Sequence, residues 1–319
     1  MAKLNKEVVN QFVVCGKVLD ITNFKEGNIG QPNEYFGFTV KVLVDEEANE
    51  VIPVEFFTTA KMENRFKSFD TLYSELKTVA NDGEEGADVV RITGKLTDNS
   101  YYSKGELVKK MVLSAEYCNR KKAKPNDKFV TGATFKALAL IDKVNEVDDK
   151  LVLNTLINNY KSKNGKIAGE NLEIVVEGDK FIKGFDKMLE KTESKSPGFT
   201  LMPVSGKVVN DVEIIKVDES ELVEEDVEDS FGDFVDEVEE RNAHKRDLKE
   251  NGIRREHLAL RLTGAKVGIT KEEVEEKEYP YDSMDIEDMW DIICDKMLKN
   301  KERDASKMGL VIDDGDNPF

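Results

Sequence analysis

The sequence predicts a mainly β protein with a minor α+β component, built from two consecutive five-stranded barrels. Short runs in which apolar and polar residues alternate at period two indicate half-buried strands. In each half of the first 217 residues, a single helix-type pattern interrupts these runs after the third strand. The order of three strands, one helix and two strands then repeats after about 110 residues, which indicates a tandem duplication.

The first copy covers residues 1–119 and opens with a strand at residues 8–19. Gly16 lies inside this strand and predicts a bulge or a sharp bend, as small barrels use to turn a corner. The second strand, residues 35–44, shows the clearest alternation, because every second residue from Phe36 to Val44 is apolar. Strands are also predicted at residues 50–58, 88–96 and 106–117, with an amphipathic helix at residues 60–80.

The second copy covers residues 130–217 and follows a basic linker at residues 120–129. The segment Val204-Ser205-Gly206-Lys207-Val208 echoes Ile92-Thr93-Gly94-Lys95-Leu96, and both segments follow a predicted helix. This echo places the fourth strands of the two copies in equivalent positions. Strands are predicted at residues 135–147, 150–157, 171–176, 199–208 and 211–217, with a helix at residues 179–191.

The acidity of the chain belongs to its C-terminal third. Residues 1–217 carry 32 Lys and Arg against 33 Asp and Glu, a net charge of -1. The remainder carries 47 − 32 = 15 basic and 65 − 33 = 32 acidic residues, a net charge of -17. Residues 218–240 hold 13 acidic residues and no basic one, so we interpret them as a solvated acidic linker.

The C-terminal region, residues 241–308, is expected to be partly helical. Residues 241–262 are charged and compatible with a helix, and residues 270–278 form a second, Glu- and Lys-rich candidate. An apolar stripe at helical spacing then follows a plausible N-cap at Asp285. Packing on the barrels and association with a partner or a second copy both stay open for this stripe, which consists of Ile286, Met289, Trp290, Ile293 and Met297.

The composition narrows the class of protein. No run of about 18 apolar residues exists, so no membrane span is expected. Residues 1–7 lack the apolar core of a signal peptide, and the three separated cysteines suit a reducing cytoplasm. No phosphate-binding glycine loop, nucleophile–base pair or metal-ligand spacing is present. We therefore expect a cytoplasmic protein that is not an enzyme and needs no cofactor or metal.

The predicted order of elements is that of the five-stranded oligonucleotide/oligosaccharide-binding barrel, the OB-fold. Residues 9–118 resemble the core of bacterial and phage single-stranded-DNA-binding proteins. The resemblance rests on the first strand, residues 10–18, and on the fourth, Val89 to Leu96 with its central Gly94. The end of the chain matches independently, because that family closes an acidic tip with Pro-Phe; Asn317 stands here where the family usually has an apolar residue.

Single strands bind such barrels by stacking bases on aromatic rings while Lys and Arg contact the phosphates. In the first copy, candidate side chains lie on the outward faces of the second to fifth strands and on the loop between the last two. The second copy offers a similar aromatic and basic loop. The predicted DNA-binding residues are Tyr35, Lys41, Phe57, Arg91, Lys95, Tyr101, Tyr102, Lys104, Lys109, Lys110, Tyr160, Lys161 and Lys163.

The resemblance implies a role in DNA replication, recombination or repair, with single-stranded DNA as the ligand. It also implies that the disordered acidic tail, residues 309–319, recruits replication or recombination proteins or folds back over the basic groove. A homo-oligomer stays open, as does a barrel protein that binds proteins or glycans instead of DNA. The residues expected to act in the tail are Asp313, Asp314, Asp316, Pro318 and Phe319.

Overall fold

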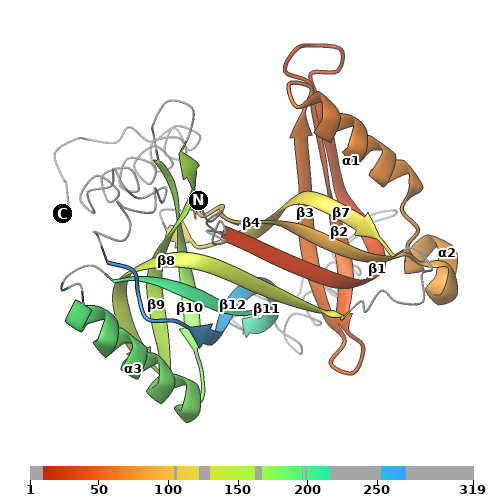
Figure 1. Ribbon diagram of the computed structural model, residues 1–319. Helices are drawn as coiled ribbons and strands as arrows, with labels where there is room; N and C mark the ends of the chain where they lie inside the picture. The colour runs from red at the N-terminus through yellow and green to blue at the C-terminus, as the bar shows by residue number, and fades with distance from the viewer. Residues whose placement is uncertain are drawn as a thin grey trace, which may run out of the picture. The chain divides into compact units, whose positions relative to one another are not determined.

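The computed structural model describes residues 10–103, 106–121, 130–161, 167–195, 197, 200–215 and 253–270. Strands dominate these ranges, which confirms the mainly β fold (Figure 1). No helix in the described ranges is long and apolar enough to cross a membrane. In chain order the elements are β1 (Asn10–Gly27), β2 (Tyr35–Asp45), β3 (Glu50–Thr59), α1 (Glu63–Glu75), α2 (Val79–Gly86), β4 (Val89–Asp98), β5 (Tyr101–Ser103), β6 (Glu106–Val108), β7 (Met111–Arg120), β8 (Gly132–Val147), β9 (Lys150–Lys161), β10 (Ile167–Val176), α3 (Asp179–Lys195), β11 (Leu201–Ile215) and β12 (Ile253–Ala265).

Five strands of the N-terminal half close into a ring, which we call the first barrel. β1 pairs with β2, β2 with β3, β3 in parallel with β7, β7 with β4, and β4 again with β1. The alternating residues of β2 explain the closure, because one face of each strand is buried inside the ring. Its core is built on the fully buried side chains of Phe12, Phe38, Val40, Phe56, Ile92, Leu96 and Leu113.

A second ring, the second barrel, is formed by β8, β9, β10, β12 and β11, in which β12 pairs in parallel with β10. The expected fifth strand at residues 211–217 is wrong: β11 runs through to Ile215, and β12 supplies the fifth strand. The helix expected within residues 241–262 is also wrong for Ile253–Ala265. Leu258, Leu260 and Leu262 alternate at period two and pack on the core, a strand pattern that the preceding charges obscured.

Both barrels lie in one compact unit of the chain. The ends of β11 and β12, beyond Val209 and before Leu258, belong to a second unit.

The two barrels share one construction at the crossing of their first and fourth strands. Phe12 lies opposite Gly94 in the first barrel, and Phe135 lies opposite Gly206 in the second. A Cβ at Gly94 would overlap the Ser114 carbonyl and the Phe12 ring, and one at Gly206 would overlap the Arg261 carbonyl and the Phe135 ring. The echo between the two Gly-Lys segments therefore marks the same close approach of the fifth strand.

β1 also joins the two barrels. Its first half, Asn10 to Cys15, pairs antiparallel with β8, and Phe12 lies opposite Phe135 there (Figure 1). From Lys17 onward β1 pairs with β2 instead, and its register shifts between Val18 and Asp20, two residues after the bend predicted at Gly16. One strand thus belongs to the first barrel and to the seam with the second.

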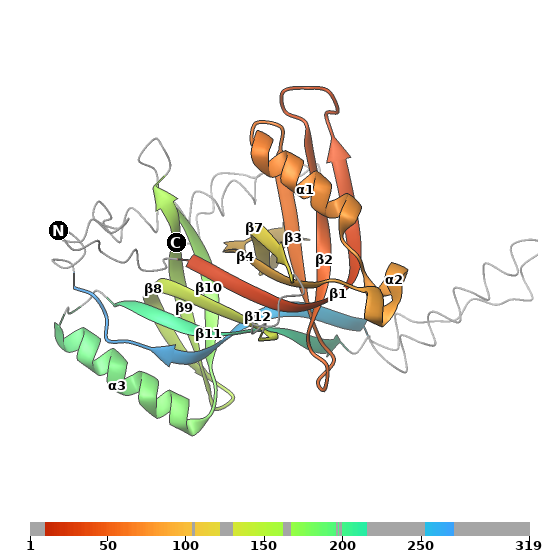
Figure 2. The same cartoon turned by 45° about the vertical axis from the view of Figure 1, so that its right-hand side comes forward.

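Helices close one side of each barrel. The helix predicted at residues 60–80 is two helices, because the backbone leaves helical geometry at Leu76 and restarts after the Thr78 cap. Phe66 and Phe69 of α1 pack edge-on against Phe36 and Phe56. In the second barrel α3 lies against β10 and buries Phe185 (Figures 1 and 2).

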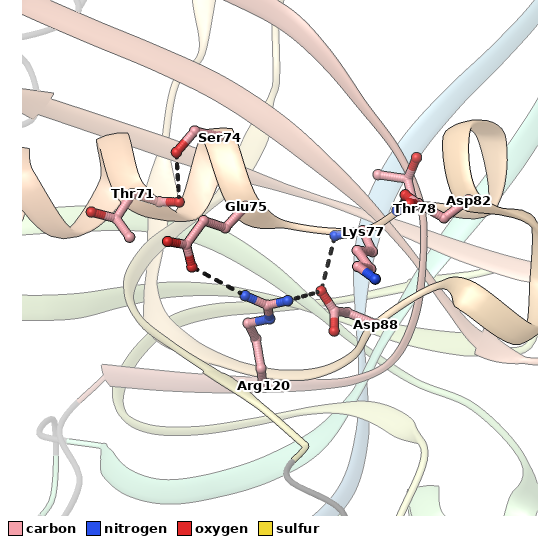
Figure 3. Close-up of polar contacts among 8 residues, drawn as sticks. All are labelled: Thr71, Ser74, Glu75, Lys77, Thr78, Asp82, Asp88 and Arg120. Carbon is pink, nitrogen blue, oxygen red and sulfur yellow. Dashed lines mark hydrogen bonds and ion pairs between the residues drawn. The ribbon is translucent and has the colours of Figure 1, made fainter.

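Arg120 fixes the end of β7 to this helical region (Figure 3). Its guanidinium lies 2.8 Å from the Asp88 carboxylate and 3.4 Å from that of Glu75. The same Asp88 oxygen accepts the backbone N–H of Lys77 at 2.9 Å. Arg120, the first residue of the predicted linker, is therefore part of the first barrel.

Cys118 of β7 provides a probe of this packing. The half-buried thiol packs on the core beside Ile92, and burial raises its pKa from 9.0 to about 12. Between these two pH values an unfolded chain loses the thiol proton while the folded chain keeps it. The raised pKa therefore stabilises the fold fully below about pH 9, and this contribution falls as pH rises towards 12.

We predict that the wild-type chain loses about 1 kcal/mol more unfolding free energy than Cys118→Ala between pH 8 and pH 10. Urea unfolding of both proteins at the two pH values measures this difference. All other ionisable groups are the same in both proteins, so their contribution cancels in the comparison. Equal losses in the two proteins would show that the folded chain does not hold the Cys118 proton.

Candidate nucleic-acid interface

The outer face of β1, β2 and β3 on the first barrel exposes Lys25, Phe57 and Lys41, whereas Gly37 and Thr39 between them are buried. Along β2 the side chains of Phe36, Phe38 and Val40 point into the core, so the alternate residues from Tyr35 to Lys41 lie on the outer face. Cross-strand pairing places Tyr35 beside Gly27 and Thr59. Gly37 lies opposite Lys25 of β1 and Phe57 of β3. Thr39 lies opposite Thr22 and Glu55, and Lys41 lies opposite Asp20 and Pro53.

Two aromatic side chains dominate one end of this surface. The ring centroids of Tyr35 and Phe57 lie 5.8 Å apart, with an interplanar angle of 36°. Phe57 is 48% exposed, whereas its neighbour Phe56 is 1% exposed in the core. Phe57 therefore lies on the outer face of β3 and not in the core.

Two glycines make room for these rings. A Cβ at Gly27 would lie 2.7 Å from the Tyr35 ring, and a Cβ at Gly37 would lie 3.2 Å from the Phe57 ring. Each ring therefore lies close to a backbone position that carries no side chain. We call Tyr35, Phe57 and the two glycines beneath them the aromatic platform.

Two lysines lie near the aromatic platform, one beside it on β1 and one further along β2. Lys25 of β1 is exposed, and its side chain lies close to Gly37 beside Phe57. Lys41 is exposed at the other end of β2, six residues or about 20 Å from Tyr35. Sequence reasoning missed Lys25 because it ended the first strand at residue 19, whereas β1 continues to Gly27.

The two basic residues predicted on β4 differ in what they contact. Arg91 is exposed on the outer face and lies opposite Cys15 and Asn119. Lys95 lies 3.3 Å from the Glu116 carboxylate, which also lies 3.8 Å from Arg65 of α1. Glu116 therefore offsets the charge of Lys95, and a contact of Lys95 with phosphate stays a prediction.

The strand predicted at residues 106–117 is two strands, β6 and β7, and β6 pairs with β5 of the preceding predicted loop in a short hairpin. Tyr101 is 39% exposed on β5, and Lys110 is exposed after β6. Lys109 forms an ion pair with Glu173 of β10 in the second barrel, and its contact with phosphate stays a prediction. Tyr102 lies on β5 with its side chain outside the described part of the structure, and Lys104 lies outside the described residues.

The second barrel does not repeat the aromatic platform. Glu55 pairs with Ser114, and Val175 occupies the same place opposite Arg261, so the equivalent of Phe57 is Glu177. Glu177 binds Lys150 at 2.6 Å and Arg261 at 3.0 Å. The hydrogen bond from Lys150, together with the Arg261 charge, lowers the pKa of Glu177, so this carboxylate stays ionised at neutral pH.

Several predicted residues fall where the structure gives no side-chain description. Tyr160 and Lys161 lie at the end of β9, and Lys163 lies outside the described residues. The apolar stripe of residues 286–297 and the tail residues Asp313, Asp314, Asp316, Pro318 and Phe319 also lie outside the described residues.

The described residues contain no group of three or more His, Cys, Asp or Glu side chains arranged to hold a metal ion. What the outer face of the first barrel offers instead is a pair of flat apolar rings with cations beside them. Aromatic rings can stack on the bases of unpaired nucleotides, and lysines can contact their phosphates.

Comparison with known proteins gives one family and several distant folds. The family model described as YorF matches residues 8–288. No curated protein matches the sequence. Among solved structures, the single-stranded DNA binding protein from Thermus aquaticus is similar at 11% identity and a TM-score of 0.37, over 64% of this chain and 87% of that one.

Two shorter structures match about one third of the chain. A mitochondrial single-stranded DNA binding protein from S. cerevisiae is 10% identical over 36% of this chain and 97% of that one, with a TM-score of 0.25. The N-terminal domain of the PriB protein from Thermoanaerobacter tencongensis is 16% identical over 35% of this chain and 97% of that one, with a TM-score of 0.20.

Proposed function

This chain belongs to the YorF family, and we propose that it binds single-stranded DNA on the outer face of its first barrel. The aromatic platform is the observation that carries the proposal. Phe57 is nearly half exposed in a strand whose neighbouring Phe side chain is fully buried, and Tyr35 lies beside it. Lys25 and Lys41 supply positive charge at the two ends of the same face.

Stacking of bases on Tyr35 and Phe57 would hold the strand with little preference for sequence, since every base presents a flat π-face. The lysines would contact the phosphates, which makes the affinity depend on salt. Glu55 and Asp20 lie on the same face and offset the charges of Lys25 and Lys41, so stacking is expected to carry most of the affinity. The protein would act by binding, without chemistry on the DNA.

We further propose that the chain protects and organises single-stranded DNA during replication, recombination or repair, in a phage and therefore in the cytoplasm of its bacterial host. The support is the resemblance of residues 9–118 to that class of protein and the acidic Pro-Phe end of the chain. Phe319 would enter an apolar pocket on a replication protein, with the aspartates and the terminal carboxylate held by basic side chains around it.

Phe57→Ala should weaken binding of an oligothymidine by about 5- to 100-fold, because one stacked base contributes about 1–3 kcal/mol. Phe181 on α3 offers a matched control, since its ring is 45% exposed but lies on the second barrel. Phe181→Ala should leave the affinity unchanged. Fluorescence anisotropy of the full-length proteins at two salt concentrations measures both.

If Phe57→Ala and Phe181→Ala both bind oligothymidine with wild-type affinity, the proposed site is wrong. If the wild-type chain binds no single strand even at low salt, the proposed function fails. The barrels should then be tested for protein or glycan ligands.

Removing residues 309–319 should tighten oligothymidine binding by about two- to tenfold at low salt, if the tail competes for the basic face. The gain should shrink as salt rises, because screening weakens contacts between exposed charges. A variant that ends at residue 217 would also lose β12, so it could not isolate the effect of the tail. Equal affinity with and without the tail would leave partner recruitment as its only proposed role.

A further inference from the structure

The β5–β6 hairpin is anchored to the second barrel by the residues on both sides of its base. On the incoming side, the backbone N–H of Asp98 donates to the Glu170 carboxylate at 2.6 Å. On the outgoing side, Lys109 forms an ion pair with Glu173. Glu170 and Glu173 both belong to β10, so a single strand of the second barrel holds the base of the hairpin.

The two anchors differ in strength. Glu170 is 6% exposed, and a hydrogen bond in such a buried place is electrostatically stronger than one in water. The pair of Lys109 and Glu173 is exposed, and an exposed ion pair contributes about 0.2–1 kcal/mol. Glu170 therefore fixes the position of Asp98, and Glu173 restrains the opposite strand.

Hydrogen bonds within the first barrel carry this restraint into the hairpin. The Asp98 carboxylate accepts the N–H of Ser100 at 2.9 Å, and the Ser100 hydroxyl accepts the N–H of Lys110 at 3.1 Å. The N–H of Asn99 donates to the Lys110 carbonyl at 2.7 Å. The hydrogen bonds thus join both ends of the hairpin into one base, which consists of Asp98, Asn99, Ser100 and Lys110. Tyr101 follows this base on β5.

This base lies at the end of the outer face that is opposite to the aromatic platform. β4 enters the hairpin at Asp98, and β7 leaves it at Met111, which pairs with Asp98. Glu55 of β3 pairs with Ser114, so Met111 lies three residues beyond that point, towards the end of β3 where Pro53 faces Lys41. A strand bound on Tyr35 and Phe57 would therefore pass Lys41 before it reached Tyr101 and Lys110.

We propose that Glu170 and Glu173 of the second barrel are positioning residues for DNA binding by the first, holding the hairpin so that Tyr101 and Lys110 extend the face begun at the aromatic platform. This inference rests on the proposed function. It assigns to Lys109 a structural contact with Glu173, where the sequence suggested a phosphate contact. The second barrel, which has an ion pair in place of Phe57, then serves to orient a part of the first.

A charge exchange between Lys109 and Glu173 tests the inference on exposed side chains. Lys109→Glu and Glu173→Lys should each weaken oligothymidine binding by about two- to fivefold. The double variant Lys109→Glu/Glu173→Lys should restore it to within about twofold of wild type. Glu177→Gln is the matched control, since it removes a negative charge and the two ion pairs of Glu177 within the second barrel and should leave the affinity unchanged.

Two results would overturn the inference. If Glu173→Lys tightens binding, the residue acts through its charge alone. If the double variant stays as weak as Lys109→Glu, then Lys109 contacts phosphate directly. When Phe57→Ala weakens binding but the exchanged pair has no effect, the inference falls while the proposed function stands; a wild-type chain that binds no oligothymidine overturns both.

Hydrogen exchange on the free full-length protein provides a readout that does not depend on DNA. Glu173→Lys and Glu170→Ala should speed exchange at the amides of residues 99–110 relative to wild type, whereas Glu177→Gln should not. Glu170→Gln should stay close to wild type, because its amide oxygen can still accept the Asp98 N–H. Unchanged exchange in both anchor variants would show that β10 does not hold the hairpin.

Discussion

The antiparallel pairing of β1 with β8 is the constraint on which the rest of the structure depends. Residues Phe12 to Cys15 use both edges of the strand, one for β4 of the first barrel and one for β8 of the second. The side chain of Asn10 extends the first of these ladders, since its amide donates to the Leu96 carbonyl and accepts the Leu96 N–H. With the barrels joined in this way, β10 lies within hydrogen-bonding reach of the β5–β6 hairpin.

Within that shared frame the two barrels differ in chemistry at equivalent positions. The crossing of the first and fourth strands is the same in both, down to the glycine that admits the fifth strand beneath a Phe ring. On the outer face, however, Phe57 in one barrel corresponds to Glu177 in the other. The exposed ring that we propose for base stacking is replaced by a carboxylate bound to Lys150 and Arg261, which would repel phosphate. We infer a division of labour in which one barrel binds DNA and the other supports it.

The sequence alone predicted what depends on local pattern. The alternation along residues 35–44 gave the buried and exposed faces of β2, and the Gly94 and Gly206 segments marked equivalent crossings. It failed where long-range pairing decides. β12 was read as helix-compatible because charged residues precede its alternating leucines, and nothing local shows that it pairs with β10 across the acidic linker.

The candidate site followed the same division. Tyr35 and Phe57 could be placed on the outer face from period two, but their mutual packing over the two glycines depends on the register of β1, β2 and β3. Lys25 was missed because the sequence did not show that β1 continues beyond residue 19. Lys95 and Lys109 were expected to contact phosphate, yet each faces a glutamate from a strand distant in sequence, which no local pattern reveals.

Photo-crosslinking tests directly whether the outer face of the first barrel binds single-stranded DNA. The full-length chain would be irradiated in complex with an oligothymidine, and mass spectrometry would identify the crosslinked residues. The account predicts crosslinks at Tyr35 and Phe57 of the first barrel, with further ones at Tyr101. Efficient crosslinking confined to the second barrel, with β2 and β3 unmodified, would contradict it.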